Sequence, residues 1–191
     1  TKVIITTDLE FRQEENEIVG EKIFEDMAIK MFSIRHKYFN QLGWKSRNIV
    51  LKSESGDSKS QFIVGRSLIE GLNDFPVDTK IGLDFIKKSI ANGNKESLAY
   101  YIMELTRGKI LPRYTDKARK LVELLNEEGY ESKYFNLLGH INKKDELYKE
   151  SKVNFKQSIS QGNADSIYEY WKLLIKEHDL TTKHGETEVE A

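Results

Sequence analysis

Four glycines recur along this 191-residue chain at nearly constant intervals, and this spacing constrains the fold more than any other feature of the sequence. Gly56, Gly93, Gly129 and Gly162 are 37, 36 and 33 residues apart. Three of them are followed directly by Asn or Asp, and by serine four residues after the glycine, whereas the copy at Gly129 departs from this pattern. A period of about 20–50 residues is typical of repeat proteins, in which each repeat buries its apolar face against the next.

Apolar residues keep the same register relative to these glycines. The matching columns lie seven residues before each glycine (Ile49, Ile86, Val122, Phe155) and six (Phe62, Ala99, Phe135, Tyr168), eight (Val64, Tyr101, Leu137, Tyr170) and twelve residues after it (Leu68, Leu105, Ile141, Leu174). Glycine readily adopts the left-handed conformation that ends a helix, and a following Asn or Asp caps the next helix. Each copy therefore predicts a helix–turn–helix repeat whose apolar columns form the core.

Composition excludes several other classes of protein. The chain has no Cys, which rules out disulfides, Cys-based zinc sites, iron–sulfur clusters and cysteine nucleophiles. Lys and Arg number 30 against 31 Asp and Glu, and this net charge of −1 disfavours a nucleic-acid partner. No apolar run approaches the roughly 18 residues of a membrane-spanning helix, so we expect no membrane insertion. A soluble, cytoplasmic chain is favoured.

Two segments, residues 77–94 and 107–121, resemble the Sel-one-like repeat family, which is related to tetratricopeptide repeats. The residues that carry the resemblance are the loop glycines Gly71 and Gly108, the acids Asp78 and Asp116, the pair Lys117-Ala118 and the Gly-Asn turn at Gly93. The resemblance covers roughly residues 45–178. It implies an all-α fold, a right-handed α/α superhelical solenoid of antiparallel helix pairs.

This reading divides the chain into three parts. Residues 1–44 are expected to form an N-terminal capping helix or a degenerate repeat, because apolar residues recur at helical spacing over residues 14–42. Residues 45–178 are expected to hold about four Sel-one-like repeats. Residues 179–191 are polar and are expected to form a frayed tail.

The sequence lacks the patterns that would indicate catalysis, a metal or a cofactor. The four histidines, His36, His140, His178 and His184, show no pair at the spacing of a helical metal site. No phosphate-binding glycine loop and no Gly-x-Ser-x-Gly motif occurs. We therefore expect no enzyme activity, no metal and no cofactor, although an enzyme with a dispersed site would not show in sequence.

The predicted function is that of a protein-interaction module or adaptor that holds another protein or a peptide segment. The resemblance implies that the first helix of each repeat lines a concave surface, where lysines and an arginine would favour an acidic peptide. A solvated convex face explains the same charges. The candidate partner-binding residues are Lys87, Lys88, Tyr100, Tyr114, Arg119, Glu123, Asn154 and Lys156. Self-association through the ends of the stack stays open, and the alternative is an accessory fragment of a larger protein whose catalytic or membrane part lies outside this chain.

Overall fold

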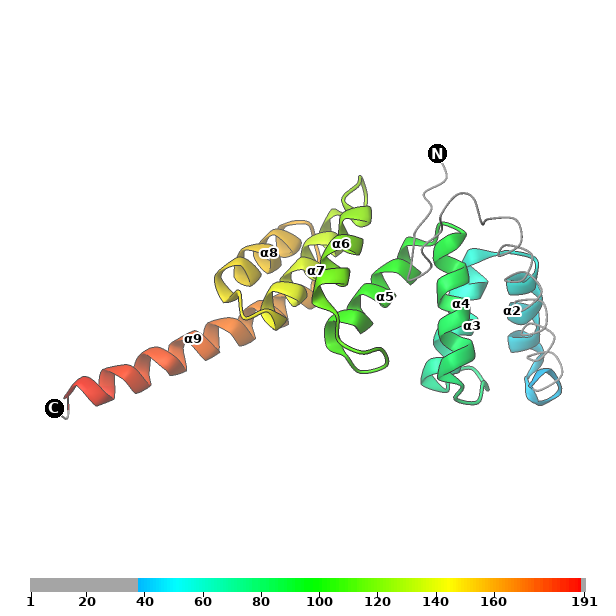
Figure 1. Ribbon diagram of the computed structural model, residues 1–191, viewed down its shortest axis with the longest axis horizontal. Coiled ribbons are helices and arrows are strands. Elements are labelled where there is room, and N and C mark those ends of the chain that lie inside the picture. The colour runs from blue at the N-terminus through cyan, green and yellow to red at the C-terminus, as the bar shows by residue number, and fades with distance from the viewer. Residues whose placement is uncertain (1–37, 190–191) are drawn as a thin grey trace, which may run out of the picture. The chain divides into compact units, whose positions relative to one another are not determined.

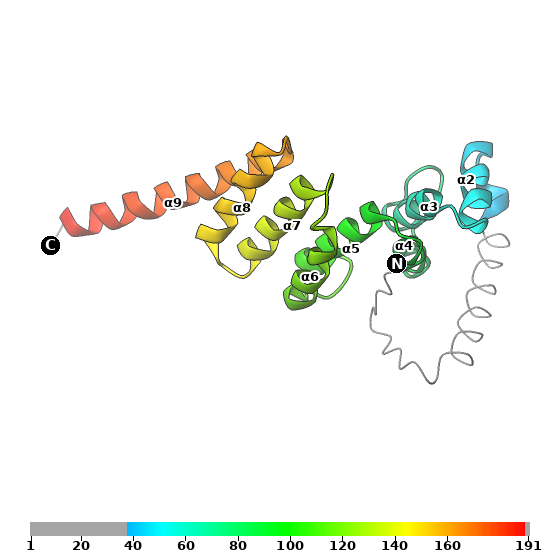
Figure 2. The same ribbon diagram turned by 90° about the horizontal axis from the view of Figure 1, so that it is seen from above.

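The computed structural model describes residues 38–189, with side chains described as far as residue 177. Within this range the chain is helical, with no strand (Figures 1 and 2). The elements are η1 (Phe39–Gln41), α2 (Trp44–Glu54), α3 (Ser58–Glu70), α4 (Thr79–Ala91), α5 (Lys95–Arg107), α6 (Thr115–Val122), η2 (Glu123–Leu125), α7 (Glu131–Lys144), α8 (Tyr148–Ser160) and α9 (Asp165–Val189). The all-α prediction is confirmed. Most of the predicted N-terminal cap, residues 1–37, lies outside the described residues.

The helices form pairs around the predicted turns. Each turn glycine lies between a leading helix (α2, α4, α6 or α8) and a following helix (α3, α5, α7 or α9), and all four glycines have φ between 83° and 95°. The Asx caps are confirmed at three turns: Asp57 accepts a hydrogen bond from the Ser60 amide, Asn94 accepts one from the Ser97 amide, and Asn163 accepts one from the Asp165 amide. A side chain with a Cβ would be strained at these φ values, so the glycines end the leading helices as predicted.

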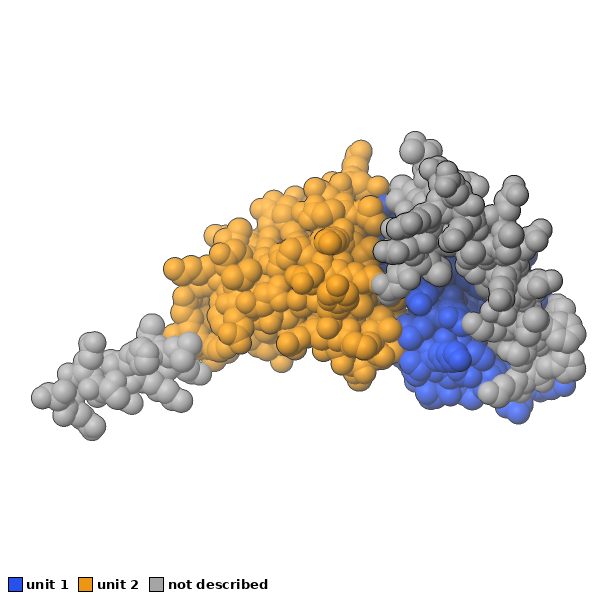
Figure 3. Space-filling model, viewed as in Figure 1, with its two compact units in different colours: residues 1–98 blue, residues 99–191 orange. Residues whose placement is uncertain are grey.

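The chain divides into two compact units, residues 1–98 and residues 99–191 (Figure 3). The boundary falls within α5. In unit 1, one cluster of the described core contains Tyr38, Leu42, Val50, Val64, Leu68, Phe75 and Phe85. Helices α3 and α4 touch backbone to backbone at Gly65 and Gly82. A Cβ on Gly65 would lie 2.8 Å from the Gly82 carbonyl oxygen, so this crossing point requires glycine.

Unit 2 contains α6 to α9 and most of α5. Its fully buried side chains include Ile102, Val122, Leu125, Ile141 and Phe155. Helix α7 crosses α8 at Gly139, where an added Cβ would meet three atoms of the Phe155 ring at 2.6, 2.6 and 2.9 Å. The ring of His140 contacts the same phenyl group edge-on at 5.2 Å between centroids. The α7–α8 contact is therefore tightly filled.

Buried serines join the helices at one turn in each unit. In unit 1 the Ser89 and Ser97 hydroxyls lie 2.6 Å apart, and Ser89 also lies 2.6 Å from the Ser58 carbonyl oxygen. In unit 2 the Ser166 hydroxyl donates to Ser158 at 2.8 Å, and Ser158 donates to the Ser132 carbonyl at 2.6 Å. Ser97 and Ser166 are the serines that recur four residues after the turn glycines, and both are hydrogen-bonded to a serine of the preceding helix.

In the first three copies the columns eight and twelve residues after each glycine are confirmed as core, whereas Ile49, Phe62 and Phe135 of the other two columns are only half-buried; the fourth copy agrees only in part. Val64, Leu68, Tyr101, Leu105, Leu137 and Ile141 are all buried on the following helices. On α9, by contrast, Tyr168 and Leu174 are exposed, so their assignment to the core is wrong. Within the described range no helix follows α9 to cover them. Helix α9 itself continues to Val189, beyond the predicted end of the repeats at residue 178.

Candidate partner-binding surface

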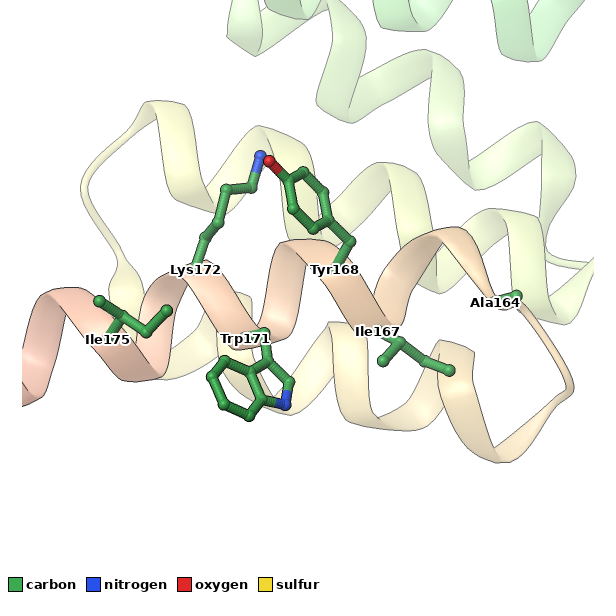
Figure 4. Close-up of a pocket in the computed structure, with 6 residues that line it drawn as sticks. All are labelled: Ala164, Ile167, Tyr168, Trp171, Lys172 and Ile175. Atoms are coloured by element: carbon green, nitrogen blue, oxygen red, sulfur yellow. The ribbon is translucent and has the colours of Figure 1, made fainter.

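One face of α9 exposes a continuous stripe of large apolar side chains. The exposed fractions are 49% for Ile167, 67% for Tyr168, 60% for Trp171, 38% for Leu174 and 48% for Ile175. These positions repeat at three and four residues, so they share one side of the helix. We call these five residues the α9 face. A shallow hollow of about 390 Å³ runs along it, lined by four residues of the face and by Ala164 and Lys172; Leu174 lies outside the hollow (Figure 4).

The opposite side of α9 is fixed to the rest of unit 2. Leu173 is buried, and Ser166 is completely buried between Ser158 and the Asn136 amide, which donates to its hydroxyl at 2.7 Å. At the outer edge, Lys152 of α8 pairs with Glu177 at 2.6 Å. Both ends of the described stretch are thus attached, and the α9 face is held outward on a rigid support. Figures 1 and 2 show α9 continuing past the ends of α7 and α8.

A charged cluster beside the α9 face ties α9 to α7. Glu169 accepts hydrogen bonds from Lys143 at 2.7 Å and from Lys172 at 2.5 Å. Partial burial raises the pKa of Glu169, but these two lysines outweigh that effect and the net shift is downward. The Nζ atom of Lys172 also lies 4.3 Å from the Tyr168 ring centroid, and Figure 4 shows these two side chains leaning toward each other. Lys172 therefore orients Tyr168 at the rim of the hollow.

His140 lies next to this cluster and is neutral at physiological pH. Burial lowers its pKa to about 4, and the nearby Glu169 only partly opposes this shift. Its ring packs against Phe155. His140 therefore has a structural role in the contact between α7 and α8. No group of three or more acidic or histidine side chains that could hold a metal ion occurs in the part of the chain that the structure describes.

The eight predicted partner-binding residues are divided between the units. Lys87 and Lys88 lie on α4 in unit 1, where Lys87 is exposed and the Lys88 amine stands 5.2 Å from the Phe85 ring centroid. The other six lie in unit 2: Tyr100 is half-buried on α5, Tyr114 is exposed just before α6, Asn154 is half-buried on α8 and Lys156 is exposed there.

Two of those six, Arg119 and Glu123, already have partners within unit 2. The Arg119 guanidinium donates to the Asn142 amide oxygen and to Asp145, each at 2.8 Å, and so ties α6 to the end of α7. Glu123 accepts from the Tyr134 hydroxyl at 3.3 Å. Desolvation, followed by the charge of Glu123, raises the pKa of Tyr134. These contacts give Arg119 and Glu123 a structural role between neighbouring helices.

The sequence did not reveal the α9 face, because an apolar stripe along a helix has the same periodicity whether or not another helix covers it. Tyr168 and Leu174 were assigned to core columns, and Trp171 was not singled out. The signal that could have identified the face is that the stripe is the last one in the repeat series.

Across residues 38–189, no helix combines the length and apolar character needed to cross a membrane.

Comparison with known proteins adds a similarity to a solved structure. No protein-family model and no curated protein sequence matches the chain. Among solved structures, it is similar to the crystal structure of a Sel1 repeat protein from Oxalobacter formigenes, with 14% sequence identity and a TM-score of 0.48 over 65% of this chain and 96% of that one. The fold assignment accordingly rests on the helix pairs of this chain itself.

Proposed function

We propose that this chain is a protein-interaction module without catalysis of its own, and that the α9 face is its main contact surface. The observation that carries this proposal is the exposure of five large apolar side chains on one fixed helix. Trp and Tyr are enriched at interface hot spots because they bury a large area with few rotatable bonds. A face held rigid by its own unit loses little conformational entropy on binding.

The charged surface predicted from the sequence stays a second proposal. Lys87 and Lys88 present positive charge on α4, which suits an acidic segment of a partner. Arg119 fits this role less well, because its guanidinium is already used by Asn142 and Asp145. We therefore place the apolar contact first. Changing Lys87 and Lys88 together to glutamate and finding partner binding unchanged would reject the charged surface.

The experiment compares affinity capture by the wild-type chain with capture by the variant Trp171→Asp, followed by mass spectrometry of the bound proteins. A carboxylate at this position places a charge in the apolar contact, so we expect the specific partner to be lost. The matched control is Trp44→Asp, because Trp44 is 71% exposed at the start of α2 in unit 1. Equal capture by both variants and the wild type would contradict the proposal.

A further inference from the structure

We propose that the occupant of the α9 face is a second copy of this chain, paired with the first through its own α9 helix in a two-fold contact centred on Trp171. This inference rests on the proposed function, because it names the partner of the same surface. A two-fold contact uses one patch twice, so the patch must be complementary to itself. The α9 face can be judged on that requirement from its sequence order, its charges and its area.

The apolar residues of the face are arranged symmetrically about Trp171. Ile167 and Tyr168 lie four and three residues before it, and Leu174 and Ile175 lie three and four residues after it. In an antiparallel pair centred on Trp171, residues equally far before and after the axis lie opposite each other. Ile167 then faces the partner's Ile175, and Tyr168 faces the partner's Leu174, while the two indoles meet at the axis. Every exposed apolar side chain of the face gains an apolar neighbour.

Two further exposed charges of α9 lie outside this contact. Asp165 and Lys176 stand six residues before and five residues after Trp171, so they lie roughly 120–140° around the helix from it. The Lys176 amine donates to the Tyr148 hydroxyl of α8 at 2.8 Å and lies 4.1 Å from the centroid of that ring, so it is turned toward unit 2. Neither charge therefore opposes the apolar contact.

The one cation close to the proposed axis among the described residues of α9 is compensated within its own chain. Lys172 follows Trp171 directly, so the two copies of Lys172 would approach each other in the pair. Each amine is already bound to Glu169 at 2.5 Å and faces the Tyr168 ring. Repulsion between the two copies is therefore reduced by a carboxylate on each side.

The exposed area sets the strength of the pair. Aromatic side chains offer roughly 150–250 Å² each, so the partly exposed α9 face provides roughly 500 Å² per copy. Two copies would bury roughly 1,000 Å², which is near the lower limit for a specific interface. We therefore expect a reversible dimer with a dissociation constant in the range of about 1–100 µM rather than a permanent one.

The first test is sedimentation velocity of the full chain from about 1 to 300 µM, which brackets the expected dissociation constant. We expect the wild type and the control Trp44→Asp to pass from monomer to dimer over this range. Trp171→Asp should stay monomeric, with a helical circular dichroism spectrum that matches the wild type. If that variant does not fold, Ile175→Ser, also on the exposed side of α9, replaces it and should weaken dimerisation about tenfold. A wild type that stays monomeric, or a dimer that neither substitution weakens, would overturn the inference.

The capture experiment separates this inference from the proposed function. A wild-type chain that is monomeric at all concentrations, but whose capture of a different protein requires Trp171, overturns the second-copy occupant and leaves the proposed function standing. A chain that neither dimerises nor captures a protein through Trp171 removes both.

Discussion

Replacing Gly139 by alanine places a methyl group where α7 crosses α8, directly against the ring of Phe155. The added Cβ would lie 2.6 Å from two ring carbons, whereas carbon atoms in ordinary contact are about 3.5–4.0 Å apart. The ring must therefore move by about 1 Å. It has little room to do so, because Phe155 is completely buried and the His140 ring packs against its edge.

The expected net effect is a destabilisation of about 2 kcal/mol. Overpacking of a filled core costs about 1–3 kcal/mol, and we take the upper part of this range because the ring cannot move freely. Replacing glycine by alanine inside a helix stabilises the folded chain by about 1 kcal/mol, which offsets part of that cost. For a chain of this length, a loss of about 2 kcal/mol lowers Tm by roughly 4–8 °C. Thermal unfolding followed by circular dichroism at 222 nm measures the shift.

A double-mutant cycle separates the steric cause from a general effect of alanine. In a Phe155→Leu background the ring is gone, so Gly139→Ala should cost nothing or should stabilise by up to about 1 kcal/mol through its helix propensity. A Gly139→Ala chain as stable as the wild type would refute the reasoning. So would the same loss of stability with and without the Phe155 ring.

Three further predictions concern polar groups of unit 2. Because the pKa of His140 is about 4 in the folded chain and about 6.5 when unfolded, the unfolded chain binds the proton first. Stability should therefore fall by about 2–3 kcal/mol as pH drops from 6.5 to 4, and His140→Gln should flatten urea-unfolding midpoints across this window. Ser158→Ala should cost about 1 kcal/mol by leaving the Ser132 carbonyl without its buried donor, whereas Ser158→Thr, which keeps a hydroxyl, isolates the steric part of any change. Arg119→Gln should change the free energy of unfolding by less than about 1 kcal/mol, because its ion pair with Asp145 is partly exposed; a larger loss in denaturant unfolding would contradict this.

The sequence was sufficient to predict the helix pairs, because their signals are local. A glycine with positive φ followed by Asn or Asp ends one helix and caps the next within a few residues. This held at Gly56 and Gly93, where Asp57 and Asn94 accept the predicted hydrogen bonds. The register of the columns likewise follows from helical periodicity alone.

What could not be predicted depends on neighbours distant in the sequence. Tyr168 occupies the same column as Ala99, yet Ala99 is buried and Tyr168 is exposed. The difference is whether another helix lies against the stripe, and periodicity within one helix does not record that. For the same reason Arg119 looked available for a ligand, although Asp145, 26 residues later, pairs with it. Contacts between repeats decide both cases.

The buried serine pairs make the helix contacts resistant to slippage. Apolar columns that recur along a helix allow a neighbour to shift by one turn, about 5.4 Å, and still find apolar contacts. A hydroxyl bond of 2.6–2.8 Å is lost over that distance, and the pairs Ser89–Ser97 and Ser158–Ser166 would both leave buried polar atoms without partners. These bonds therefore oppose the sliding of one helix along the axis of the next. A chain pulled from its ends should therefore yield by separating whole helix pairs rather than by sliding one helix along the next.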